Sequence, residues 1–308
     1  MFLNNDLAIF KQKPDKHLKR ILGFIDADAD SKTFGCCDRN YWHYKLNDYS
    51  NARYQEACLI LAFAYSDENC FLRKNDKALN LIKAIINFWL EKSNKNGSVD
   101  EIYPYEQSFC ATAFGAYIII ETIELLGLEI GGWKNKLEKT GEWLKKNGNW
   151  HISNQIAASA IGLYNFGKAL NRDDFLAESG RRAEYLIAEY DKKKYFPEYG
   201  GFDLGYCSIT MSCLSRLYQK TGKTGILNCL KSAAEDFDAR LDKYGNYDNI
   251  NMSRHTAFLY PFGFKSAKIE VLRKIKAGLE ADAILNPDWL DDRYLTGLSN
   301  DYLMAYYF

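Results

Sequence analysis

The chain has 308 residues, enough for one large domain with a substantial core. Its 40 basic and 40 acidic side chains cancel, which argues against a nucleic-acid-binding protein, since such proteins usually carry a net basic face. The longest uncharged apolar stretch runs only from Phe109 to Ile120, too short to cross a bilayer, so we expect no membrane span.

The sequence favours a cytoplasmic location. The N-terminal residues MFLNNDLAIF lack the basic start and the continuous apolar segment of a secretory signal peptide. The eight cysteines form no CxxC pair and no Cys–His spacing typical of zinc ligands. Several lie in apolar helical runs, where a free thiol behaves as a small hydrophobic group. We therefore expect reduced cysteines and no metal centre.

Residues 1–34 are predicted to be an N-terminal segment with one short amphipathic helix at Asp15–Leu22. The next stretch, Gly35–Gln55, mixes charged side chains with large aromatic rings. Buried charges are costly unless they are paired, and disordered linkers contain few aromatics. We therefore interpret this stretch as a wall of a binding or catalytic site. Its candidate residues are Asp38, Arg39, Tyr41, Trp42, His43, Lys45, Arg53 and Gln55.

From residue 54 onward, two kinds of helical segment alternate. A helix that is apolar on most sides must be buried, whereas a helix with one apolar stripe lies outside it. Inner helices are predicted at Tyr54–Tyr65, Glu106–Leu126, Asn154–Leu170, Gly205–Tyr218, Ser253–Phe264 and Asp291–Phe308. Outer helices are predicted at Asp76–Lys92, Trp133–Lys146, Asp173–Tyr190, Thr224–Leu241 and Ser266–Leu285.

The alternation repeats every 48 to 52 residues. Repeats of this length made of helix pairs stack on one another, because each unit buries what its neighbours leave exposed. The N-terminal helix supplies the missing sixth outer helix. We therefore predict an all-α, single-domain fold, with residues 35–308 forming a closed (α/α)₆ toroid; an open helical solenoid is the alternative.

In such a ring, the polar and aromatic loops before the inner helices open at one rim. The free backbone N–H groups of the helix N-termini there favour an anion. We expect the catalytic residues to be His43, His151, Tyr206 and His255. The remaining candidate substrate-binding residues are Glu106, Gln107, Asn154, Gln155, Glu198, Asp203 and Arg254. Two of the carboxylates could also serve as an acid–base pair across a sugar.

Four segments resemble a known family: GCCDRNYWHYK…NARYQEA, NWHISNQIAASAIGLYNFG, PEYGGFDLGYCSITMSCLSRLYQKTG and SRHTAFLYPFGF. They are similar to the toroid domain of heparinase II/III-like proteins. More closely, they resemble small helical proteins or domains associated with bacterial capsule and exopolysaccharide biosynthesis, over about residues 33–308. In lyases of this class, an Asn, Gln, Arg or His neutralises a uronate carboxylate, and a Tyr or His removes the C5 proton. The resemblance implies these roles for His151, Asn154, Gln155, Tyr206, Arg254 and His255.

The lyases carry a β-sandwich after the toroid and are usually exported, whereas this chain ends at Phe308 and shows no signal. We therefore expect an enzyme that builds or tailors a surface polysaccharide, acting on a hexuronic acid by elimination or epimerisation at C5. One alternative is a ligase that forms an amide or ester on the carboxylate with Mg-ATP, although no GxxxxGK[ST] loop is present. Another is a non-catalytic module that binds polysaccharide or a glycosyltransferase. The expected ligand is a sugar nucleotide, oligosaccharide or polysaccharide.

Overall fold

The computed structural model describes residues 7–308, and within that range the chain is all-helical. Extended backbone pairs there only as two isolated bridges, Val99 with Ser108 and Glu198 with Gly201. The predicted all-α class is therefore confirmed. Residues 1–6 of the predicted segment 1–34 lie outside the described residues.

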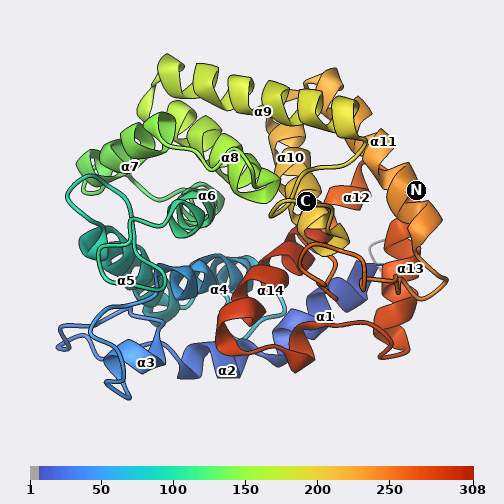
Figure 1. Ribbon diagram of the computed structural model, residues 1–308. Coiled ribbons are helices and arrows are strands. Elements are labelled where there is room, and N and C mark those ends of the chain that lie inside the picture. Colours follow the sequence, from blue (N-terminus) through green and yellow to red (C-terminus); the bar gives the residue numbers. More distant parts are fainter. Residues whose placement is uncertain (1–6) are drawn as a thin grey trace.

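The helices lie in an inner and an outer set (Figure 1). The inner set is α4 (Ala57–Ser66), α6 (Phe109–Leu126), α8 (Ser153–Leu170), α10 (Leu204–Thr221), α12 (Phe262–Lys265) and α14 (Asp292–Tyr307). The outer set is α1 (Ala8–Lys16), α5 (Asp76–Lys92), α7 (Lys134–Lys146), α9 (Asp173–Lys193), α11 (Thr224–Arg240) and α13 (Ile269–Glu280). The connections contain α2 (Leu18–Gly23), α3 (Arg39–Trp42) and the 3₁₀ turns η2 (Ala52–Glu56) and η3 (Pro287–Trp289).

Contacts between helices follow a simple order. From α4 to α13, each inner helix contacts the outer helix that follows it in the chain, and α1 contacts α14. Each inner helix also contacts the next inner helix, and α14 contacts α4. This last contact joins distant parts of the chain, since the side-chain amide of Asn300 donates to the carbonyl oxygen of Glu56, 244 residues away, at 2.9 Å.

Helix α6 illustrates why the inner helices form and where they stop. Ser108 caps it by accepting a hydrogen bond from the N–H of Ala111, and Gly127 ends it in the left-handed conformation, φ 60°. It is long and apolar enough to span a membrane by length and composition, but 72% of it is buried within the fold, as expected of a core helix.

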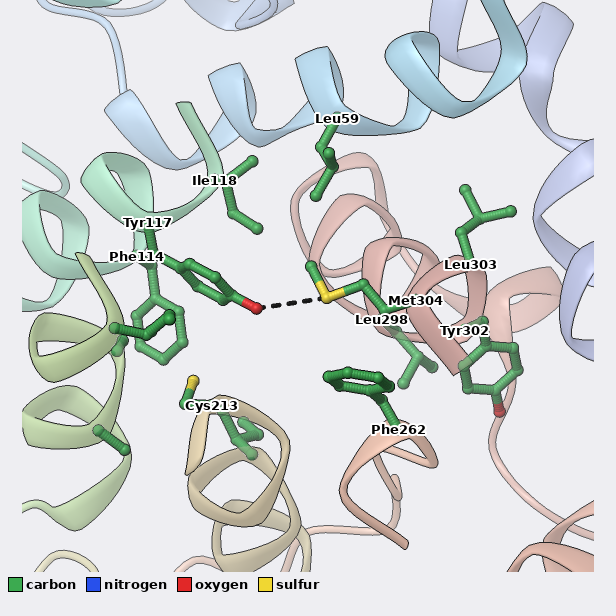
Figure 2. Close-up of a cluster of buried hydrophobic side chains, with 14 of the residues drawn as sticks. Leu59, Phe114, Tyr117, Ile118, Cys213, Phe262, Leu298, Tyr302, Leu303 and Met304 are labelled. Carbon is green, nitrogen blue, oxygen red and sulfur yellow. Dashed lines mark hydrogen bonds between the residues drawn. The ribbon is translucent and has the colours of Figure 1, made fainter. Parts of the chain in front are cut away.

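The inner helices surround a hydrophobic cluster, shown in Figure 2. Leu59 of α4, Tyr117 of α6, Cys213 of α10 and Met304 of α14 meet there, and the hydroxyl of Tyr117 lies 3.3 Å from the sulfur of Met304. Phe114 belongs to the same cluster and also lines the cavity described below. The cluster therefore supports the floor of that cavity.

The predicted inner helix Ser253–Phe264 is wrong, because only the short helix α12 forms near its end. Asp203 accepts hydrogen bonds from the N–H groups of Arg254 and Thr256, so these groups are bound outside any helix. His255 has φ 51°, which an α-helix excludes. Contacts with α10 and its cap thus override the local pattern.

Other boundaries differ less. The N-terminal helix predicted at Asp15–Leu22 is two helices, α1 and α2, and begins earlier at Ala8. The predicted outer helix Ser266–Leu285 is shortened to α13. The inner helix predicted from Glu106 begins at Phe109, because Gln107 has φ 55°. Helix α5 has its predicted bounds.

Candidate functional site

A cavity of about 710 Å³ opens where the N-terminal ends of α6, α8 and α10 come together with the start of α14. This volume falls within the usual range for small-molecule sites. The cavity is lined by residues from all of these elements, from η2 and from the irregular segment before α12. Its walls contain aromatic rings, amides and charged groups.

One wall is a row of aromatic rings. The ring centroids of Tyr199 and Tyr206 are 5.2 Å apart, those of Tyr206 and Phe258 are 5.7 Å apart, and those of Phe258 and Tyr260 are 5.7 Å apart. All four rings line the cavity. The row offers a continuous apolar surface with hydroxyl groups at three of its four rings, which suits a ligand with both flat apolar faces and polar groups.

Arg254 stands at this wall with its guanidinium 4.5 Å from the ring centroid of Tyr199. In the described part of the chain, no carboxylate lies within ion-pairing distance of that guanidinium. Asp203 positions the residue through its backbone N–H at 3.2 Å, while also capping α10 through the N–H of Tyr206 at 3.0 Å. A bidentate donor without an anionic partner is therefore held at the cavity wall.

Two ion pairs hold the other cationic groups of the cavity. Arg53 pairs with Glu56 beneath the cavity, and its guanidinium lies 4.4 Å from the ring centroid of Phe114. Burial disfavours the charge on Arg53, yet Glu56 keeps the pKa of the guanidinium above its ordinary value. Arg293, at the start of α14, pairs with Glu101. These two arginines are thus compensated, and Arg254 is the one available to a ligand anion.

The first turn of α8 contributes two amides. Asn154 and Gln155 both line the cavity. Glu198 fixes Asn154 by accepting hydrogen bonds from its N–H at 2.9 Å and its side-chain amide at 2.6 Å. Gln155 lies 3.4 Å from the hydroxyl of Tyr199 and receives a hydrogen bond from Asn149 at 3.3 Å. These amides are held in place before any ligand arrives.

Four non-glycine residues in the loops around the cavity have left-handed backbone. Tyr105, Gln107, Tyr199 and His255, which come from three different loops, have φ values of 61°, 55°, 51° and 51°. Non-glycine residues rarely adopt this conformation, and where they do the surrounding structure must stabilise it. Such strain is frequent at functional sites, and here it marks the same rim as the cavity.

The tyrosines of the wall are proton donors at neutral pH. Burial raises the pKa of Tyr206 well above its usual range, and Arg254 offsets only part of that shift. Burial also raises the pKa values of Tyr199 and Tyr260. Tyr206, which the sequence predicts to be catalytic, is therefore protonated at neutral pH and does not rest as a tyrosinate base.

The structure brings seven of the predicted site residues together at the cavity: Arg53, Glu106, Gln107, Asn154, Gln155, Tyr206 and Arg254. Two more, Glu198 and Asp203, lie behind this wall, where they hold Asn154 and Arg254 respectively. These nine positions, which come from separate helical repeats, therefore lie at or directly behind one cavity wall.

The three predicted catalytic histidines lie elsewhere on the rim. His43 is exposed and packs between the rings of Trp42 and Tyr44. His151 is exposed, and the ring of His255 lies 3.0 Å from the carbonyl oxygen of Asn249. No histidine lines the cavity among residues 7–308.

Most predicted residues of Gly35–Gln55 serve the local fold or a neighbouring cavity. Gln55 is buried and binds the backbone of Cys37, Gly35 and Ile85. The rest are placed as follows: Asp38 caps α3, Arg39 pairs with Asp292, Trp42 donates to the carbonyl oxygen of Phe24, Tyr41 accepts from Lys92, and Lys45 is exposed.

Glu101, which forms an ion pair with Arg293, was not predicted as a site residue. Arg293 pairs with Glu101 although Asp292 is adjacent in the chain, because Asp292 binds Arg20 and Arg39. Nothing in the local pattern marks Glu101, because its partner is 192 residues away. Phe258, which lines the cavity, was not predicted as a site residue either, because its segment was predicted to be helical.

No protein-family model matches the chain, and no curated protein sequence is significantly similar to it. Among residues 7–308, no group of three or more His, Cys, Asp or Glu side chains is arranged to hold a metal ion. The eight cysteines are free thiols. The function must therefore be argued from the cavity itself.

Proposed function

We propose that the protein is an (α/α)₆ toroid whose central cavity binds an acidic sugar, in particular a hexuronic acid at the end of a saccharide. The toroid is supported by the order of helix contacts, in which α14 contacts α4 and α1 occupies the sixth outer position. The resemblance of the loop phrases to heparinase II/III-like and capsule-biosynthesis proteins points the same way. A cytoplasmic role in assembly or tailoring of a surface polysaccharide fits this proposal.

One observation carries it. Arg254 has no carboxylate partner among the described residues and stands beside the aromatic rings of Tyr199 and Tyr206 in the cavity wall. The guanidinium can bind a carboxylate through two parallel hydrogen bonds, while the rings cover the apolar face of the sugar. The amides of Asn154 and Gln155 supply further hydrogen bonds to hydroxyl groups.

The reaction that we propose is proton abstraction at C5, beside the sugar carboxylate that Arg254 neutralises. Glu106 is the candidate base. Its Oε2 accepts hydrogen bonds from the N–H groups of residues 101 to 103, which orients the carboxylate, while Oε1 accepts none in the described part of the chain. Tyr206, which remains protonated, is the candidate donor to the oxygen that leaves C4. Epimerisation would return the proton to C5 from the opposite face.

Binding is tested with hexuronate oligosaccharides by isothermal titration calorimetry. We expect Arg254→Ala to weaken binding by about tenfold or more, because a charge-assisted bidentate contact is lost. Arg240→Ala is the matched control, since Arg240 also lies over an aromatic ring, that of Phe202, but away from the cavity. Equal affinity of wild type and Arg254→Ala would show that the carboxylate is not bound there.

Turnover is tested by mass spectrometry of the same saccharides in deuterated water, with and without Mg-ATP and simple amines. An unsaturated product or deuterium at C5 supports proton abstraction. An ATP-dependent gain in mass that matches an amide would assign the protein to carboxylate ligation instead. Binding without either product would assign it to a non-catalytic polysaccharide-binding module.

A further inference from the structure

A second cavity, of about 360 Å³, lies beside the first. It is lined by Tyr41, Tyr49 and Gln55 of the stretch Gly35–Gln55, by the C-terminal end of α5, and by part of the loop before α6. Arg53 is the only residue of this stretch that lines the central cavity. From the aromatic and charged residues of Gly35–Gln55, the second cavity takes Tyr41, Asp48 and Tyr49.

Segment 99–107, which we call the ridge, separates the two cavities. Glu101, Ile102, Glu106 and Gln107 line the central cavity, whereas Val99, Asp100, Pro104 and Tyr105 line the second one. A ligand that extended out of the central cavity across this side of the rim would therefore meet the second cavity next.

The ridge is rigid although it is exposed. The carboxylate of Asp100 accepts hydrogen bonds from the N–H groups of Tyr105 at 2.8 Å and Gln107 at 2.9 Å, the two residues with left-handed backbone. Its backbone carbonyl accepts from the N–H of Ala52 at 3.1 Å, and Tyr49 donates to the carbonyl of Ile102. The side chains on both sides of the ridge are thus positioned in advance, which lowers the entropic cost of binding.

The chemistry of the second cavity suits sugar rings. Tyr41 and Tyr105 present aromatic surface, and Tyr105 is 83% exposed. The ring centroid of the buried Phe88 lies 6.3 Å from that of Tyr41. Lys92 lies 5.3 Å and 5.6 Å from the ring centroids of Tyr41 and Phe88, and it donates to the Tyr41 hydroxyl at 3.0 Å.

No carboxylate is within ion-pairing distance of the Lys92 ammonium group in the described part of the chain, so it can donate to a ligand. Because Asp48 and Glu91 also line the cavity, its charge is mixed. A mixed set of donors and acceptors around aromatic rings fits a hydroxyl-rich ligand better than an isolated anion.

We propose that the second cavity is a saccharide subsite that holds further units of an oligosaccharide whose terminal hexuronate occupies the central cavity. This proposal rests on the function proposed above and specifies the class of ligand. The ligand is then an oligosaccharide or polysaccharide chain end.

The test compares uronic acid oligosaccharides of two and of six units by isothermal titration calorimetry. We expect the wild type to bind the six-unit probe at least about tenfold more tightly than the two-unit probe. Lys92→Ala and Tyr105→Ala should each weaken binding of the six-unit probe by about tenfold and leave the affinity for the two-unit probe unchanged. Lys77→Ala is the matched control, because Lys77 is exposed at the other end of α5 and lines neither cavity.

The outcomes separate the two proposals. Equal affinities for the two probes, or a six-unit affinity unaffected by Lys92→Ala and Tyr105→Ala, would overturn the second subsite while leaving the central one intact. Both proposals are supported if the wild type binds the six-unit probe more tightly than the two-unit probe and Arg254→Ala weakens binding of both probes. Binding of neither probe to the wild type would overturn both. Unchanged thermal unfolding of each variant confirms that the fold is retained.

Discussion

The carboxyl group of Glu198 and the amide of Asn154 are joined by two hydrogen bonds behind the cavity wall, at 2.9 Å and 2.6 Å. Thr210 adds a third hydrogen bond to Glu198 at 3.0 Å. Burial raises the pKa of Glu198 to about 8, which is far above the ordinary value of 4.5. The protonation state of a fully buried group is therefore linked to the position of a residue that lines the cavity.

This linkage predicts how stability depends on pH. The folded protein holds the Glu198 proton more tightly than the unfolded chain, so the stabilisation is complete below pH 4.5 and is lost as the pH rises through 8. Asp301, whose pKa burial raises to about 7, acts in the same direction. We expect the free energy of unfolding to fall by roughly one kcal/mol per pH unit for each such group between pH 5 and 7.

Urea unfolding at several pH values checks this expectation. Glu198→Gln, which cannot ionise, should reduce the slope, whereas Glu184→Gln, at an exposed position on α9, should leave it unchanged. A wild-type stability that rises between pH 5 and 8 would contradict the prediction.

Gly35 is predicted to tolerate no side chain. Its φ is 85°, and a Cβ would lie 2.3 Å from the backbone carbonyl of Ala84 in α5, which cannot move independently of its helix. We expect Gly35→Ala to lower the free energy of unfolding by about 3 kcal/mol or more. Gly222→Ala, at φ 66° with open space around it, should cost only about 1 kcal/mol. Similar losses for the two variants in chemical denaturation would contradict this reasoning.

The pair of Arg53 and Glu56 predicts a strong asymmetry between single and double substitutions. Glu56→Gln leaves the Arg53 guanidinium without its carboxylate beneath the cavity and should cost about 3 kcal/mol. The double variant Arg53→Met with Glu56→Leu should cost less, because no unpaired charge remains. Denaturant unfolding of both variants measures the difference, and additive losses would show that the charges are not coupled.

Tyr206 and His151 are predicted to differ in their effect on turnover. If Tyr206 delivers the proton, Tyr206→Phe should lower the rate by about 100-fold or more while keeping the aromatic wall. His151→Ala should change the rate by less than about twofold, because an exposed side chain outside the cavity has little influence on the transition state. The deuterated-water assay measures both. A larger loss in the His151 variant would return the catalytic role to the rim histidines.

Most helices could be predicted from the sequence, because the spacing of apolar residues within a segment indicates a helix without reference to distant residues. Asp76–Lys92 alternates buried and exposed positions with a helical period, and α5 has these bounds. The irregular segment around His255 could not be read in this way. Its apolar residues resemble a helix, but its backbone N–H groups are bound by Asp203, about 50 residues earlier in the chain.

Part of the candidate site was predictable for a similar reason. Asn154, Gln155 and Tyr206 begin inner helices, so their repeat positions place them at one rim. Side-chain direction within a loop depends on backbone angles that the sequence does not display. Thus His151, only three residues before Asn154, is exposed and does not line the cavity, whereas Asn154 does.

The contact between α14 and α4 bears on how the chain reaches its native state. The hydrogen bond from Asn300 to Glu56 spans 244 residues, and the neighbouring packing has a similar separation. High contact order slows folding. During synthesis, α4 and α12 lack their common neighbour until α14 leaves the ribosome, so apolar faces of the early helices stay exposed for most of translation. We therefore expect the nascent chain to depend on protection from aggregation until α14 has emerged.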